Sequence, residues 1–252
     1  MKRFFVPVLC LFLIRALDAE SVRIGVFTHY PIVMQSASDG QPYGPGVEYA
    51  KAVVRALGYE PVVKSFPVSR LIANLKTGEL DMAISLGKTD ERKEYLLYAD
   101  EASIVYQPSL TVRSDYPLDA ITSVSDLGKM KIGYLLGAYP GSFFKGDTGV
   151  QFDLIAGDSW IEQNVDKLLL GRIDGILDQN DYSCIAAARR KGVEDRIKVL
   201  RLPGEGIKSY IAFSKASPKG QSLHRAFNAL DKSSAPNQKD FIEGSLLELL
   251  SR

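Results

Sequence analysis

The sequence contains few of the residues that build disulfide bridges and metal centres. Among its 252 residues there are two cysteines, Cys10 and Cys184, and two histidines, His29 and His224. Cys10 lies in an N-terminal apolar segment that we expect to be removed, so no internal disulfide is expected. The histidines are far apart in the chain, and no Cys, His and carboxylate residues show metal-ligand spacing. We therefore expect no metal, no cofactor and a fold that depends on a packed core.

An excess of charge of either sign is also absent. The chain has 31 basic and 30 acidic residues, and its formal net charge is +1. This balance argues against a nucleic acid or an anionic membrane surface as a partner. The hydrophobic fraction of 46% and the charged fraction of 24% are ordinary for a soluble globular protein. The length suits one large domain or two lobes of roughly 100–120 residues each.

The N-terminal apolar run is too short to cross a bilayer. Lys2 and Arg3 precede apolar residues from Phe4 to Ile14, whereas a transmembrane helix needs about 20 residues. A basic start, a short apolar core and a small residue at Ala19 are typical of a cleaved secretory signal. We therefore predict that residues 1–19 are a signal peptide and that the mature protein is periplasmic. An uncleaved anchor is the alternative.

From Val22 onward the pattern alternates between strands and helices with short connections. Examples are a strand at 22–27, an amphipathic helix at 47–57 that ends at Gly58, and a buried strand at 80–86. Such alternation is typical of an α/β fold with mostly parallel strands.

Two extended segments divide the chain into lobes. The β-like run at 104–112 is interrupted by Pro108, which suits a strand that leaves one sheet for another. A second extended run, at 208–213, can return to the first lobe. We predict a two-lobed α/β fold joined by two hinge strands, with a ligand cleft between the lobes. Lobe 1 would comprise residues 20–107 and 210–252, and lobe 2 residues 108–209.

The segment from Glu79 to Asp100 contains the clearest candidate binding site. Its buried strand ends at Gly87, and Thr89 then begins a helix with acidic residues in the first turn. A helix N-terminus offers free N–H groups, and Arg92, one turn later, can bind a carboxylate with two parallel hydrogen bonds. We predict a socket for one small carboxylate. The alternative is an exposed charged helix face on which Arg92 pairs with a neighbouring acid.

Four blocks of the sequence resemble one family. They are YGPGVEYAKAVVRALGY, LIANLKTGELDMAIS, KTDERKEYLLYAD and LLLGRIDGILD, in this order. They are similar to family-3 extracellular solute-binding proteins, the polar amino-acid receptors of ABC importers, and the likeness covers nearly all of residues 22–230. The resemblance implies the type II periplasmic-binding fold, no catalytic activity, a small polar ligand and an ABC permease as partner. We also expect the protein to be a monomer.

The resemblance implies roles for residues of the first lobe. The arginine of the T-x-E-R motif holds the ligand's α-carboxylate in that family, and Arg92 occupies this position. Small residues after the third strand donate hydrogen bonds, which corresponds to Ser85 and Gly87. An aromatic residue in the first loop covers the ligand, which corresponds to Tyr30.

The resemblance also exposes departures in the second lobe. The motif that closes on the carboxylate corresponds to Gly137-Ala138-Tyr139, with Tyr139 where Thr or Ser is usual. An Asp normally pairs with the ligand's α-ammonium, but Gln179 aligns there and Asp178 precedes it. A neutral amide forgoes a charge-assisted hydrogen bond of about 1.5–3 kcal/mol. Because adjacent strand residues face opposite ways, Asp178 can substitute only if the strand has ended. We therefore expect the ligand to be an amino acid or a related carboxylate.

The sequence allows alternatives for one arginine and for the function. Arg70, after Pro67-Val68-Ser69 at a helix start, is either a second anion contact or an exposed helix arginine. A cleft enzyme similar to cyclohexadienyl dehydratases, with Asp178 as the acid, is an alternative function. A ligand-sensing module for a membrane receptor is another. The predicted ligand-binding residues are Tyr30, Val68, Arg70, Ser85, Gly87, Arg92, Ala138, Tyr139, Asp178 and Gln179.

Overall fold

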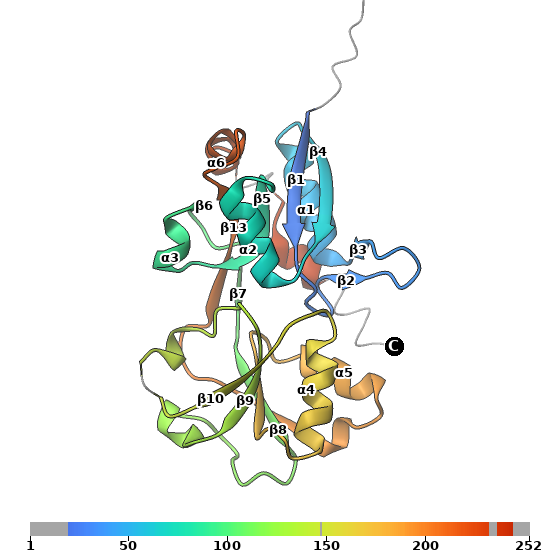
Figure 1. Cartoon of the computed structure of the whole chain (residues 1–252), viewed down its shortest axis with the longest axis vertical. Coiled ribbons are helices and arrows are strands. Elements are labelled where there is room, and N and C mark those ends of the chain that lie inside the picture. Colours follow the sequence, from blue (N-terminus) through green and yellow to red (C-terminus); the bar gives the residue numbers. More distant parts are fainter. Residues whose placement is uncertain (1–19, 147, 232–235, 244–252) are drawn as a thin grey trace, which may run out of the picture.

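Two β-sheets, each covered by helices, form two lobes stacked one on the other in the computed structural model (Figure 1). The structure describes residues 20–146, 148–231 and 236–243. The predicted signal peptide lies outside these ranges. Within these ranges, none of the helices combines the length and the apolar character that a membrane span requires.

The first lobe is built on a six-stranded sheet in the order β4-β1-β5-β13-β6, with β7 paired to β13. Strand β1 runs parallel to β4 and β5, whereas β13 is antiparallel to its neighbours. A short hairpin, β2–β3, follows β1. The elements are β1 (Ser21–Val26), β2 (Met34–Gln35), β3 (Pro42–Tyr43), α1 (Pro45–Ala56), β4 (Glu60–Ser65), α2 (Val68–Thr77), β5 (Met82–Gly87), α3 (Asp90–Lys93), β6 (Leu96–Tyr98), β7 (Ile104–Tyr106), β13 (Ile207–Ser214) and α6 (Gly220–Asn228).

The second lobe is built on a five-stranded sheet in the order β10-β9-β11-β8-β12. Strand β9 is parallel to β10 and β11, and β8 is antiparallel to β11 and β12. The elements are β8 (Ser109–Arg113), η1 (Val124–Leu127), β9 (Lys131–Leu135), η2 (Ser142–Phe144), β10 (Gln151–Ile155), α4 (Trp160–Leu169), β11 (Gly175–Asp178), α5 (Ser183–Arg190), η3 (Glu194–Arg196) and β12 (Ile197–Arg201).

The chain passes from the first lobe to the second beside Pro108, where the sequence predicts this passage. Strand β7 belongs to the first sheet and β8 to the second, so the passage occurs at Gln107 and Pro108. The return passage lies between β12 and β13. The two passages are tied together, because the Gln107 Nε2 donates to the Leu202 carbonyl at 2.7 Å and the Leu202 N–H donates to the Pro108 carbonyl at 2.9 Å.

Local sequence explains where the helices of the first lobe begin and end. Helix α1 has a proline in its first turn and buries Val47, Ala50, Val53 and Val54 along one face. Helix α2 ends at Gly78, whose φ of +80° is left-handed. A Cβ there would lie 2.8 Å from the Ala216 carbonyl oxygen, so only glycine fits this C-cap.

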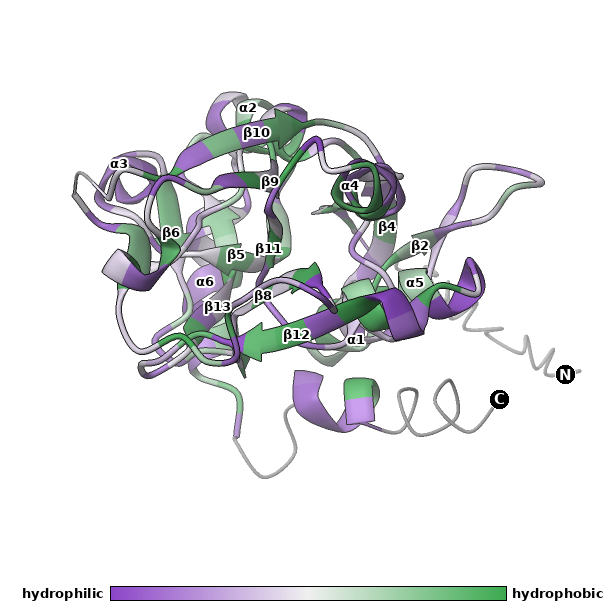
Figure 2. Cartoon of the chain, turned by 90° about the horizontal axis from the view of Figure 1, so that it is seen from below, coloured by the Kyte–Doolittle hydropathy of each residue, from purple (hydrophilic) through white to green (hydrophobic). Residues whose placement is uncertain are grey.

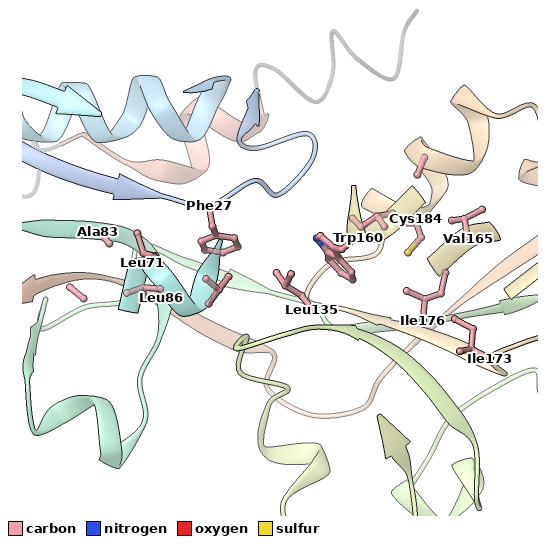
Figure 3. Packing of buried hydrophobic residues seen from close by; sticks show 14 of the residues in the cluster. Phe27, Leu71, Ala83, Leu86, Leu135, Trp160, Val165, Ile173, Ile176 and Cys184 are labelled. Atoms are coloured by element: carbon pink, nitrogen blue, oxygen red, sulfur yellow. The ribbon is translucent and has the colours of Figure 1, made fainter. Parts of the chain in front are cut away.

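One apolar cluster extends from the first lobe into the second (Figure 3). Phe27 and Leu71 represent its first-lobe part, and Leu135 and Trp160 its second-lobe part, all buried. Separate clusters fill the far sides of the two sheets. The lobes therefore meet through apolar packing as well as through polar contacts.

The structure corrects three details of the secondary structure that we expected. Both sheets are mixed rather than mostly parallel, because β8 and β13 enter them antiparallel next to the two passages. The helix after Thr89 has one turn only, α3, which is coloured purple in Figure 2 because its residues are all charged. Strand β6 and the β2–β3 hairpin were not predicted; each is too short to show a clear alternation.

Candidate functional site

Arg92 lies where the two lobes meet. Thr89 caps α3 by accepting a hydrogen bond from the Arg92 N–H, which fixes the start of the turn. Arg92 is 9% exposed; its Nη1 donates to the Gly87 carbonyl at 3.0 Å, and its Nη2 donates to the Gly137 carbonyl at 2.9 Å. Gly137 belongs to the loop after β9 in the second lobe. The arginine is thus a buried link between the lobes rather than part of an exposed charged face.

Two glycines let the lobes approach each other closely beside Arg92. A Cβ on Gly87 would lie 3.1 Å from the Cβ of Tyr139 across the interface. A Cβ on Gly137, whose φ is +82°, would lie 2.9 Å from the Ser69 Oγ in the first turn of α2. Larger residues at either position would separate the two surfaces. Tyr98 adds a hydrogen bond to the Gly87 carbonyl at 3.1 Å, and burial raises the pKa of Tyr98 to about 12.

Ser85 has an unexpected partner from the C-terminal segment. Its φ of 57° is unusual for a residue other than glycine. Gln238 is completely buried, and its Nε2 donates to the Ser85 Oγ at 2.7 Å. Ile242 and Phe241 of the same segment pack into the apolar cluster of the first lobe. The C-terminal segment therefore packs against the first lobe and contacts the end of its central strand, β5.

We expect Gln238→Ala to lower the free energy of unfolding by about 1–3 kcal/mol, because the buried Ser85 hydroxyl loses its partner. Urea denaturation measures the change. Gln221→Ala, an exposed position on α6, is the control and should stay within about 0.5 kcal/mol of the parent. Equal stability of the two variants would show that the Gln238 contact does not contribute to the free energy of unfolding.

A buried polar cluster joins the first loop to the end of β11. His29, Asp178 and Asn180 are 5%, 1% and 2% exposed. The His29 Nε2 lies 2.9 Å from the Asn180 Nδ2 and 3.4 Å from the Asp178 Oδ1. Among the residues that the structure describes, the Asp178 Oδ2 has no hydrogen-bond partner. This carboxylate therefore has an acceptor oxygen that remains available beside the interface.

The same cluster shows which way the end of β11 faces. Asp178, the last residue of β11, points its carboxylate towards His29 of the other lobe. Gln179 instead donates from its Nε2 to the Tyr139 carbonyl at 3.2 Å. Sequence reasoning did not identify His29 and Asn180; the only hint was that His29 is adjacent to Tyr30 in the first loop.

Aromatic rings surround the polar cluster. His29 stacks on Phe27, with ring centroids 5.9 Å apart, and meets the edge of Tyr106 at 6.0 Å. Burial raises the pKa of Tyr106 and of Tyr182 far above the usual range, so both phenols stay neutral. The cluster thus combines Asp178, a histidine and an amide with two neutral phenols in an apolar setting.

The remaining predicted residues lie in different surroundings. Tyr30 stacks against Arg190 of α5, with the guanidinium carbon 3.8 Å from the ring centroid. Val68 is buried in the apolar cluster that spans the lobes, and Ala138 packs against that cluster. Arg70 is exposed, and no hydrogen bond or ion pair links it to another described residue. The structure thus brings Val68 and Ala138 to the interface near Arg92 and leaves Arg70 in contact with solvent.

No group of three or more His, Cys, Asp or Glu side chains within residues 20–146, 148–231 and 236–243 is arranged as metal ligands would be. The chemistry of this region is therefore that of a guanidinium, a buried carboxylate, a histidine and several phenols.

A family profile matches most of the chain. It is that of the bacterial extracellular solute-binding proteins, family 3, and the match extends over residues 22–236. The comparison with curated proteins found no match.

Solved structures of similar shape cover nearly the whole chain. A substrate-binding protein of an amino acid ABC transporter superimposes with a TM-score of 0.66 at 20% identity, over 91% of this chain and 97% of the other. An ancestral arginine-binding protein bound to arginine gives 0.70 at 20% identity, over 90% and 98%. AbpA of Streptococcus pneumoniae, bound to L-arginine, gives 0.66 at 19% identity, over 92% and 93%. At these identities the likeness shows the fold.

Proposed function

Because this chain belongs to the bacterial extracellular solute-binding proteins, family 3, we propose that it captures a small polar solute between its lobes and delivers it to an ABC importer. The observation that carries this proposal is the position of Arg92, whose guanidinium contacts Gly87 of one lobe and Gly137 of the other. A ligand held at this point touches both lobes at once.

Arg92 is suited to hold a carboxylate there. Its contacts with two carbonyl oxygens leave further N–H groups of the guanidinium without a partner among the described residues. A carboxylate would accept hydrogen bonds from a buried cation, which are stronger than those between neutral groups. It would also compete with the Gly137 carbonyl for Nη2. Ligand binding then favours the closed arrangement only through contacts that the open one lacks.

We propose an amino acid as the ligand class. The unpartnered Oδ2 of Asp178 is a buried acceptor at the interface, and an ammonium group would satisfy it. Gln179 occupies the position that the family resemblance assigns to this role, but the orientation of β11 favours Asp178 instead. An amino acid would thus present its carboxylate to Arg92 and its ammonium to Asp178.

The biological setting follows from the same proposal. The neighbours described above include proteins of amino acid ABC transporters and proteins bound to arginine. We propose that residues 1–19 direct export, that the mature protein acts in the periplasm as a monomer without catalytic activity, and that its partner is an ABC permease.

Arg92→Ala tests the proposal directly. The parent protein is screened by thermal shift against the amino acids, simple amines and small carboxylates. A ligand at about 100 times its Kd stabilises by roughly 2.7 kcal/mol, which at this size raises the Tm by roughly 5–10 °C. We expect the shift to vanish in Arg92→Ala, because the carboxylate loses its cation.

Arg55→Ala is the matched control, since Arg55 is exposed at the end of α1. It should keep the full ligand-induced shift. An amino acid that stabilises parent and Arg92→Ala equally would contradict the proposed site. Stabilisation by carboxylates without an amino group, but not by amino acids, would contradict the role of Asp178.

A cleft lyase is a second candidate function, and one contact favours it. His29 lies 3.4 Å from Asp178 across the interface, so a possible base and a possible acid stand together in a buried setting. Incubation with prephenate, monitored for loss of the cyclohexadienyl ring, tests it. Turnover that disappears in both His29→Gln and Asp178→Asn would support an enzyme, and an unchanged substrate would exclude this reaction.

A further inference from the structure

A cavity lies between the lobes, beside the segment between β12 and β13 by which the chain returns to the first lobe. Its volume is about 500 Å³, within the range of small-molecule sites. The first lobe contributes Lys88, Lys93 and Tyr210 to its wall, and the second lobe contributes the segments 139–143 and 203–206. Arg92 and Asp178 do not line it. Tyr139 does line it, so this cavity lies next to the site described above but includes neither Arg92 nor Asp178.

The charge of the cavity wall is predominantly positive. Lys88, Lys93 and Lys208 line it, against one acid, Glu205. Lys93 is paired with Asp90 at 2.7 Å, and Lys208 lies 4.0 Å from Glu205.

Lys88 differs from the other two lysines because it has no carboxylate partner within the part of the chain that the structure describes. Its ammonium lies over the rings of Tyr98 and Tyr210 instead, 5.6 and 5.2 Å from the centroids. Cation–π contacts hold the ammonium in place without neutralising its charge. Lys88 thus presents a positioned cation to the cavity.

The wall also carries aromatic rings and proline faces. Tyr139 and Phe143 of the second lobe line the cavity together with Tyr210, and Pro108, Pro140 and Pro203 line it as well. Rings and proline faces offer flat surfaces against which another ring can stack. A small polar solute such as a short amino acid would leave most of these surfaces in contact with water.

We propose that this cavity is a second ligand site, and that it binds a small aromatic anion whose charged group contacts Lys88 and whose ring lies among Tyr139, Phe143 and Tyr210. Either a carboxylate or a phosphate can supply the charge, since an ammonium pairs with both. Because both lobes line the cavity, a ligand there also favours the closed arrangement.

Ligand-observed NMR titration with benzoate and with phenyl phosphate tests the proposal. We expect saturable binding with a Kd of about 1 mM or below, and a loss of about tenfold in affinity in Lys88→Gln, which removes a charged hydrogen bond. Lys64→Gln is the matched control, because Lys64 is an exposed lysine in β4, an edge strand of the same sheet, and does not line the cavity. Comparing the two probes shows whether carboxylate or phosphate is preferred.

Several outcomes would overturn the second site. These are no saturable binding of either probe, equal affinity in Lys88→Gln and the parent, or equal binding of benzylamine, which has the opposite charge. Arg92→Ala separates this proposal from the proposed function, since the variant should still bind both aromatic anions but should no longer bind amino acids. If benzoate binding is lost in Arg92→Ala but not in Lys88→Gln, the anion binds at Arg92. This result would support the proposed function and refute the second site.

Discussion

Arg23→Met is expected to lower the free energy of unfolding by about 3 kcal/mol, since it leaves a buried carboxylate without its cation. Asp81 is completely buried, and the Arg23 Nη2 lies 2.7 Å from its Oδ1 and the Nε 3.1 Å from its Oδ2. The Arg23 backbone N–H and the Ser217 hydroxyl also donate to this carboxylate. Arg23 is 45% exposed, which places the expected loss at the lower end for a buried pair.

Urea denaturation at neutral pH measures this effect, and Lys51→Met provides the comparison. Lys51 pairs with Glu48 on the exposed face of α1 at 2.8 Å. Exposed pairs of this kind contribute about 0–1 kcal/mol, so Lys51→Met should change stability little. If the free energy of unfolding falls equally in the two variants, the Arg23–Asp81 pair contributes no more than a surface pair, and the burial of Asp81 is unimportant.

The same pair predicts a dependence on pH. Burial alone would raise the pKa of Asp81, but hydrogen bonds from Arg23 and Ser217 outweigh it and hold this pKa below its usual range. The Asp81 carboxylate therefore binds a proton more tightly in the unfolded chain than in the folded protein. The stability that this ion pair contributes is present above a pH of about 4 and is lost as the pH falls further. The difference between the parent and Arg23→Met should shrink over that acid range, and a constant difference from pH 7 to pH 3 would contradict this account.

Gly87→Val is expected to weaken ligand binding by about 10- to 100-fold while the protein stays folded. A Cβ at this position already lies 3.1 Å from the Cβ and from a ring carbon of Tyr139, so the branched side chain forces the lobes apart. Overpacking of this kind costs about 1–3 kcal/mol, and each 1.4 kcal/mol is about a factor of ten in affinity. The backbone N–H of residue 87 is retained. Calorimetric titration with a ligand found by the thermal-shift screen measures the loss.

Two further variants separate closure from folding. Tyr139→Gly in the Gly87→Val background removes the opposing atoms and should restore about tenfold in affinity. Gly25→Val introduces a clash inside the first lobe, where a Cβ would lie 2.2 Å from the Leu71 Cδ1. It should lower the Tm of the unliganded protein far more than Gly87→Val does. Equal loss of Tm in the two valine variants would show that Gly87 serves folding and not closure.

Much of the architecture could be predicted because it depends on short-range patterns. The amphipathic face of α1 and the apolar run of β5 are recorded in consecutive residues, and both elements lie where the patterns predict them. Gly58 and Gly78 follow α1 and α2 because a left-handed residue ends each helix at low cost. Pro108 marked the passage between sheets because proline cannot donate a ladder hydrogen bond.

The partners of the site residues could not be predicted in the same way. Thr89 and the acids after it indicated that Arg92 follows a helix start, but not that the guanidinium reaches the carbonyl of Gly137, 45 residues along the chain. Gln238 and Ser85 are 153 residues apart, and no local pattern connects them. The alternation of side chains along a strand did not decide which of Asp178 and Gln179 points towards the other lobe, since that depends on where β11 ends and how its lobe is placed.

The amino-acid sequence by itself thus determined the two-lobed α/β organisation, the segment that carries Arg92 and the family to which the chain belongs. It could do so because secondary structure and motifs depend on neighbours within a few residues. Only the tertiary structure decided that His29 meets Asp178, that Arg92 links the lobes, and that Lys88, held over two tyrosine rings, borders a cavity between the lobes. Each of these features depends on the packing of one lobe against the other, which brings together residues that are distant in the chain.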